Sequence, residues 1–292
     1  MYNQTMHNNN HIYKLKDGRR LGYCEYGHPK GKPLFFFHGF PGSRFSGEET
    51  HEAAKKIGIR VISTDRPGIG LSDYQHDRKL LDWPDDVVEL ADHLKIKTFC
   101  VLGISGGGPY SAVCAYKIPH RVSRAGIVVG LAPTKIKSNL EGLPLLNKFG
   151  WSYYHKSSLL RQIAVLGTAL EFKYLPTVGY LIAFRNKEDR DIYKQLVHKR
   201  KGKIRSTVEA FRQGLKGPCL ELKIYSDDWD FKLSDIKTGV YLWYGLKDKC
   251  VPVSMGKYYK SQIPNSRLFI NKKAGHLARH NFEEKILKRL ID

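Results

Sequence analysis

The sequence lacks the features that would tie it to a metal, an oxidising compartment or the interior of a membrane. Only five of 292 residues are cysteine, and no two stand in a Cys-x-x-Cys pair, so we expect reduced thiols and no metal site. The most apolar stretch, Tyr174 to Phe184, is far shorter than the roughly 20 residues of a membrane span. The polar, asparagine-rich start does not resemble a secretory signal. These absences favour a cytoplasmic protein without a transmembrane segment.

Acidic residues are also few. The chain has 49 lysines and arginines against 28 aspartates and glutamates, which gives a formal net charge of +21. Such an excess can attract nucleic acids or anionic surfaces. Residues 133–231 carry +8 of it and the remainder +13, so the bias is general. We interpret one basic run, His198 to Arg205, as a solvated helix end, and we expect no specific nucleic-acid site.

The apolar residues form short runs that alternate with helix-like stretches. A segment that alternates around Asp17-Gly18 predicts a β-hairpin. Short continuous apolar runs predict buried strands at residues 33–39, 60–65, 99–105, 125–130, 239–245 and 266–271. Helices are predicted at residues 83–94, 107–119, 253–263 and 282–291. This alternation predicts an α/β fold with a mostly parallel sheet and helices on both faces.

Residues 133–231 interrupt the alternation with a helical, aromatic-rich pattern that has no clear strands. We therefore expect a core in two parts, residues 1–132 and 232–292, with a helical insertion between them. Residues 140–184 are dominated by apolar and aromatic side chains. We expect some of these to form the insertion's own core and others to line a substrate pocket.

The third predicted strand ends at a serine flanked by glycines. Gly103, Ser105 and Gly107 form a G-x-S-x-G pattern. Between a strand and a helix, this pattern predicts a turn so sharp that the serine takes a strained backbone conformation and its hydroxyl is lifted clear of the sheet. The residues two positions before and two positions after the serine must then have almost no side chain. Ser105 is therefore a candidate nucleophile.

A serine hydroxyl needs a base, and the base needs an acid to orient it. Asp248 and His276 each stand in a loop directly after a later predicted strand, in the order Ser, acid, His that suits this architecture. Both loops then lie at the same sheet edge as Ser105. Other acids and histidines are also candidates, but none of the acids stands in a loop of this kind after a late strand. These other candidates are Asp73, Asp227, Asp228, Asp230, His38 and His280.

The oxyanion formed by nucleophilic attack needs at least two hydrogen-bond donors. One is the backbone N–H of Gly106, the residue after the nucleophile. The second is expected from the loop after an early strand, where the Phe40 N–H can face the site. His38, at the start of that loop, is expected to be a structural hydrogen bonder rather than a proton carrier.

Several segments together resemble the α/β-hydrolase superfamily in its capped branch. They are His-Gly-Phe-Pro-Gly-Ser-Arg (38–44), residues 65–73, 103–112 and 245–253, and Ala-Gly-His (274–276). The resemblance implies that the insertion is a cap over the active site and that Asp65 and Arg66 hold backbone. Relatives that cleave epoxides or carbon–halogen bonds carry aspartate at the nucleophile position, so Ser105 implies acyl transfer to water.

We therefore expect a serine hydrolase, without cofactor or metal, that cleaves small-molecule carboxylic esters with small to medium apolar or aromatic acyl groups. The same triad could serve an aminopeptidase resembling proline iminopeptidases, a hydrolase of carbon–carbon bonds, or haloperoxidase-like chemistry. The aminopeptidase would need acidic residues in the insertion, and its oxyanion loop usually has glycine where this chain has Phe40. A small-molecule receptor that keeps the triad is a third interpretation, and a homodimer is compatible with the sequence.

Overall fold

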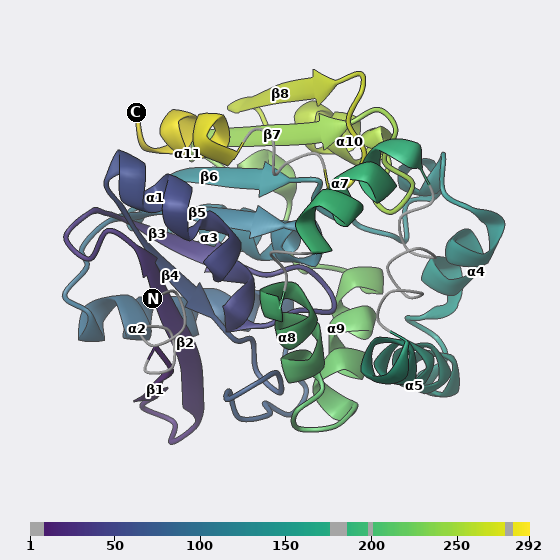
Figure 1. Cartoon of the computed structure of the whole chain (residues 1–292), viewed down its shortest axis with the longest axis horizontal. Coiled ribbons are helices and arrows are strands. Elements are labelled where there is room, and N and C mark those ends of the chain that lie inside the picture. The colour runs from purple at the N-terminus through teal and green to yellow at the C-terminus, as the bar shows by residue number, and fades with distance from the viewer. Residues whose placement is uncertain (1–8, 176–185, 198–200, 278–282) are drawn as a thin grey trace.

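A computed structural model describes residues 9–175, 186–197, 201–277 and 283–292. These residues form an eight-stranded sheet in the order β1-β2-β4-β3-β5-β6-β7-β8 (Figure 1). The strands are β1 (His11–Lys14), β2 (Arg20–Gly27), β3 (Lys32–Phe37), β4 (Ile59–Thr64), β5 (Phe99–Ile104), β6 (Val122–Val128), β7 (Val240–Gly245) and β8 (Ser266–Asn271). Only the β1–β2 and β2–β4 pairs are antiparallel among these strands. The predicted hairpin and the mostly parallel sheet are confirmed.

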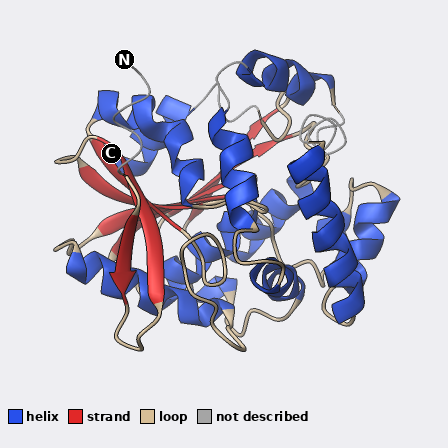
Figure 2. Cartoon of the chain, turned by 60° about the horizontal axis from the view of Figure 1, so that its bottom comes forward, coloured by secondary structure: helices blue, strands red, loops and turns tan. Residues whose placement is uncertain are grey.

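Helices cover both faces of the sheet, as Figure 2 shows with helices in blue and strands in red. The core helices are α1 (His51–Ile57), α2 (Trp83–His93), α3 (Gly108–Lys117), α10 (Val253–Gln262) and α11 (Glu283–Ile291). Phe35 and Phe37 belong to a buried cluster that includes side chains of α2, α3 and α10, whereas Leu34 and Phe36 belong to a second cluster that includes side chains of α1 and α11. Burial on alternate faces explains why this strand reads as a continuous apolar run.

Between β6 and β7 the described residues contain helices and loops but no strand. The α-helices are α4 (Leu145–Tyr153), α5 (Ser158–Tyr174), α7 (Lys187–Val197), α8 (Lys201–Ala210) and α9 (Lys216–Ser226). The arrowheads of β5 to β8 point toward this group in Figure 1. Most of the apolar stretch Tyr174 to Phe184 lies outside the described residues, and the domain boundaries stay predictions. No helix in the described ranges is long and apolar enough to cross a membrane.

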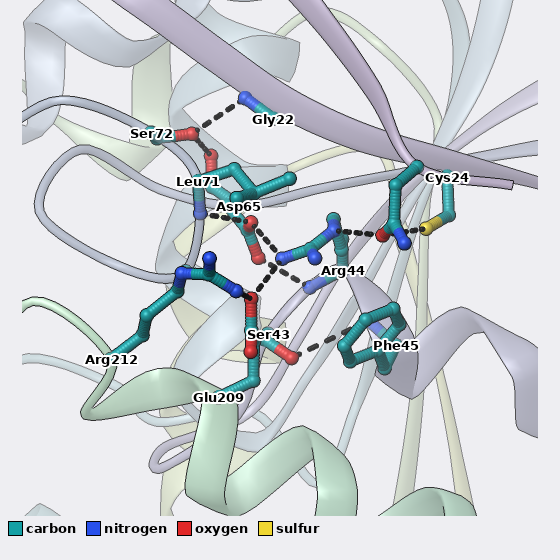
Figure 3. Close-up of polar contacts among 12 residues, drawn as sticks. Gly22, Cys24, Ser43, Arg44, Phe45, Asp65, Leu71, Ser72, Glu209 and Arg212 are labelled. Atoms are coloured by element: carbon teal, nitrogen blue, oxygen red, sulfur yellow. Dashed lines mark hydrogen bonds and ion pairs between the residues drawn. The ribbon is translucent and has the colours of Figure 1, made fainter. Parts of the chain in front are cut away.

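Arg44, in the loop after β3, joins the core to the insertion. Its Nη1 lies 2.7 Å from Asp65 Oδ2 and 2.8 Å from Glu209 Oε1 on α8. Figure 3 shows Arg44 between these two carboxyl groups, with Arg212 also reaching Glu209. Asp65 in addition accepts the backbone N–H of Arg44 at 2.6 Å and that of Leu71 at 2.9 Å. Asp65 therefore holds backbone, as the resemblance implied.

The apolar side chains of the insertion are partly buried and partly exposed. Leu140, Leu143, Val165 and Phe172 are buried. Ten others are exposed: Leu145, Leu146, Phe149, Tyr153, Leu159, Ile163, Leu166, Leu170, Tyr174 and Leu175. These ten side chains therefore lie outside the buried core that the described residues form, and the expected lining of a substrate pocket stays a prediction.

Candidate active site

Ser105 lies at the turn between β5 and α3 with a φ of 54°. This left-handed conformation is uncommon for a residue with a side chain and marks local strain. The turn is tight enough to require its glycines. A Cβ atom on Gly103 would lie 2.0 Å from the carbonyl oxygen of Gly107, and one on Gly107 would lie 2.1 Å from that of Phe37. The backbone thus has the sharp turn that the G-x-S-x-G pattern predicts.

Asp248 and His276 come together from the loops after β7 and β8. The Nδ1 of His276 lies 2.7 Å from Oδ2 of Asp248, and both side chains are buried. The other carboxylate oxygen accepts the backbone N–H groups of Cys250 at 2.7 Å and Val251 at 2.9 Å. A carboxylate held in this way can fix the orientation of the imidazole. In a Ser-His-Asp triad, this contact selects the tautomer in which Nε2 accepts the serine proton.

The loop after β3 packs against the Ser105 turn. A Cβ atom on Gly39 would lie 3.3 Å from the Cβ of Ser105, and one on Gly106 would lie 3.1 Å from the Cβ of Phe40. Phe40 and Gly106, the two candidate oxyanion donors, are therefore neighbours beside the serine. The ring of His38 hydrogen-bonds the carbonyl oxygen of Gly39 through Nδ1 at 2.8 Å. Burial holds the pKa of His38 well below its usual value, which favours a neutral, structural histidine.

A buried charge cluster, not anticipated from the sequence, fastens this loop to α9. Arg66 donates to the carbonyl oxygen of His38 at 2.7 Å and to Glu221 of α9 at 2.7 Å. Arg78 and the hydroxyl groups of Tyr110 and Tyr225 also donate to Glu221. Burial raises the pKa of the Glu221 carboxyl, but the two guanidinium groups lower it more, so that the pKa is about 2. An ionised carboxylate from the insertion thus helps to position the oxyanion loop.

A second unanticipated residue, Asp189, connects α7 to the histidine loop. Its fully buried carboxylate accepts the backbone N–H of His276 at 2.8 Å and that of Leu277 at 2.7 Å. A Cβ atom on Gly275 would lie 2.3 Å from the same carboxylate, so a glycine is needed for this approach. The side chain of Asn186 donates to Asp189 at 2.6 Å. The sequence carries no distinct signal for this contact, because an aspartate in a helix's first turn is common.

The remaining candidate acids are engaged at the surface in ion pairs of 2.7 to 2.9 Å. The pairs are Asp73–Arg20, Asp227–Lys223, Asp228–Lys135 and Asp230–Lys79. None of these four contacts involves His276. The alternative histidine His280 lies outside the described residues.

One group of side chains at the site has the chemistry of metal ligands. Asp248, Cys250 and His276 offer ligand atoms within 4.8 Å of one another, and zinc takes carboxylate, thiolate and imidazole ligands. However, Asp248 already binds His276 with one oxygen and two backbone N–H groups with the other. This arrangement suits proton transfer better than metal coordination.

Comparisons with known proteins agree with the fold. The sequence profile of the alpha/beta hydrolase fold matches residues 32–161. A non-heme chloroperoxidase from Streptomyces lividans is 34% identical over 133 residues, which is 44% of this chain and 48% of that protein. A putative proline iminopeptidase from Mycoplasma genitalium is 27% identical over 286 residues and 89% of each chain.

The match to the chloroperoxidase thus spans about half of that relative's length. The structure resembles that of an esterase from Exiguobacterium antarcticum over 96% of this chain and 99% of the other, with a TM-score of 0.68 and 18% identity. At this identity the likeness concerns the fold. With the matching profile and the sheet order, these comparisons show that the chain has the alpha/beta hydrolase fold.

Proposed function

We propose that this protein is a serine hydrolase that cleaves carboxylic esters with small to medium apolar or aromatic acyl groups. The observation that carries the proposal is the 2.7 Å contact between His276 and Asp248 at the sheet edge where Ser105 adopts its φ of 54°. A strained serine after a strand and an imidazole oriented by a buried carboxylate are the parts that nucleophilic acyl transfer needs. We expect the protein to act in the cytoplasm, where its thiols stay reduced.

In the proposed mechanism, the Oγ of Ser105 attacks the ester carbonyl carbon while His276 takes the hydroxyl proton. The backbone N–H groups of Phe40 and Gly106 stabilise the negative charge on the carbonyl oxygen. His276 then gives the proton to the leaving alcohol, and the acyl group remains on Ser105. A water molecule, deprotonated by His276, then attacks the acyl carbon. The bond between this carbon and Ser105 Oγ breaks, the acid is released, and His276 returns the proton to Ser105. Asp248 orients the imidazole and stabilises its protonated form throughout.

A second candidate is an aminopeptidase, favoured by the match over 89% of each chain to the putative proline iminopeptidase. An amine substrate would need an acidic group to bind its ammonium. In the described part of the insertion, two buried carboxylates and one partly buried carboxylate are already engaged. Asp189 accepts backbone N–H groups, Glu209 pairs with Arg44, and Glu221 pairs with two arginines. This pairing supports the ester over the amine.

A panel of p-nitrophenyl esters of increasing acyl length, together with prolyl and other aminoacyl amides, tests the proposal on wild type and Ser105→Ala. An apolar acyl site should raise kcat/KM about three- to fourfold for each added methylene until the site is full. Ser105→Ala should abolish turnover of every ester. Ester hydrolysis that survives in Ser105→Ala contradicts the proposal. A clear preference for prolyl amides would favour the aminopeptidase.

A further inference from the structure

Helix α5 has apolar residues on two opposite sides. Val165 and Phe172 are buried on the inner side, where α5 packs against α8 and α9. On the other side, exposed apolar residues recur at intervals of four and three positions, which places them on one stripe of the helix. They are Leu159, Ile163, Leu166, Leu170 and Tyr174, with exposed fractions of 67%, 59%, 46%, 47% and 65%.

Helix α4 adds a second exposed stripe, formed by Leu145, Leu146, Phe149 and Tyr153. The rings of Phe149 and Tyr153 pack at 4.7 Å between centroids. Ten of the fifteen large apolar side chains that are exposed in the described chain lie within residues 145–175. Scattered exposed apolar residues are ordinary, but a concentration of this kind marks a binding surface.

We propose that the exposed stripes of α4 and α5, nine residues in all, bind the surface of an anionic phospholipid bilayer. The positive charge of this segment supports an anionic bilayer as the binding partner. Residues 145–175 contain four basic residues, Lys148, Lys156, Arg161 and Lys173, and one acidic residue, Glu171. Amphipathic helices with basic flanks lie in the interface of anionic membranes, with apolar side chains among the acyl chains and cations near the headgroups.

A second copy of the chain is a less favourable binding partner for these stripes than a bilayer. Two copies would bring together chains that each carry a formal net charge of +21, and like charges repel. An anionic bilayer instead attracts that charge. Figure 1 shows α4 and α5 at the far end of the molecule from α1 and β1, so membrane contact through these helices leaves the sheet core in water. Binding of this kind does not depend on ester hydrolysis.

Flotation of the full chain with vesicles tests the apolar part of the proposal. Vesicles of phosphatidylcholine with about 30% phosphatidylglycerol should bind wild type at least about tenfold more tightly than phosphatidylcholine alone. The triple variant Ile163→Ser, Leu166→Ser, Leu170→Ser should bind the anionic vesicles at least about tenfold more weakly. The matched control changes three apolar residues of similar exposure elsewhere, Ile12→Ser, Val208→Ser and Ile270→Ser, and should bind like wild type.

A second pair of variants separates local charge from total charge. Lys156→Glu with Lys173→Glu should weaken binding more than Lys55→Glu with Lys97→Glu, which changes the net charge equally on the core. Sedimentation equilibrium is run on the same proteins. Absence of vesicle binding, binding that the serine variants leave unchanged, or a homodimer that those variants dissociate would each overturn the proposal.

Discussion

The carboxylate of Asp189, at the start of α7, accepts the backbone N–H of His276 at 2.8 Å. Asp248 holds the imidazole of the same residue at 2.7 Å. Two buried carboxylates therefore hold His276, one through its main chain and one through its ring. Because Asp189 belongs to the insertion, the position of the candidate catalytic base depends on a helix outside the sheet core.

Replacing Asp189 tests this dependence. In Asp189→Asn the side chain keeps its size but exchanges one acceptor oxygen for a donor, which faces a backbone N–H. The histidine loop should shift, and a misplacement near 1 Å can lower kcat about a hundredfold. We expect kcat to fall about ten- to hundredfold with a smaller change in KM. The control Asp191→Asn, on the same helix, should retain wild-type kinetics. A lower melting temperature with unchanged kcat would show that Asp189 has a structural role alone.

Gly275 offers an independent probe of the same contact. In Gly275→Ala the new methyl group would meet the Asp189 carboxylate at 2.3 Å, so the loop or α7 must move and kcat should fall. Combining it with Asp189→Ala removes the clash, and the double variant should lose less activity than the sum of the two single effects predicts. Strictly additive losses in kcat would mean that the two residues act separately.

Substitutions at the proposed triad should have the largest kinetic effects. Ser105→Ala and His276→Ala should each lower kcat by at least about a thousandfold, because triad residues act as a unit. Asp248→Asn should cost a similar factor, since the imidazole loses the carboxylate that orients it. Circular dichroism checks that each variant is folded. Near-wild-type activity in Asp248→Asn would mean that another acid orients His276.

Stability at low pH should report the Glu221 cluster. The pKa of Glu221 is about 2 in the folded protein, against 4.5 for an ordinary glutamate. A carboxyl whose pKa is lowered by folding stabilises the protein fully above its unfolded value. The stabilisation, about 3 kcal/mol for this shift, is lost as the pH falls from 4.5 toward 2.

Urea unfolding between pH 2 and 7 measures this loss in wild type. Glu221→Gln should be about 3–5 kcal/mol less stable at pH 7, because it leaves two buried guanidinium groups without their carboxylate. The exposed-pair control Asp85→Asn should differ from wild type by less than about 1 kcal/mol. If Glu221→Gln does not fold, the test rests on wild type alone, through the decrease of its unfolding free energy at acidic pH. A wild-type stability that stays flat below pH 4.5 would contradict the assignment.

Local sequence patterns were sufficient to predict the sheet, and they also indicate the three residues of the proposed triad, which stays a prediction. Phe35, Phe36 and Phe37 are buried on alternate faces, so a continuous apolar run marks their strand without knowledge of its neighbours. Ser105 and His276 stand in loops that follow strands, and the ends of parallel strands meet at one edge. These positions can be derived from the order of elements along the chain.

The long-range polar contacts could not be predicted in this way. Asp189 and His276 are 87 residues apart, and Arg66 and Glu221 are 155 apart. Neither acid stands in a motif, and the partners meet only after the insertion has packed on the core. The exposed stripe of α5 was missed for a related reason. Apolar residues on both sides of a helix indicate burial on both, whereas here α8 and α9 cover one side only.

Covalent labelling with a fluorophosphonate probe tests the central claim most directly, because only an activated serine reacts with it at an appreciable rate. After labelling and proteolysis, mass spectrometry identifies the modified residue. We expect a single adduct on Ser105 in wild type, no adduct in Ser105→Ala, and a rate of labelling at least about a hundredfold lower in His276→Ala. An unlabelled wild-type protein, or an adduct on another serine, would contradict it.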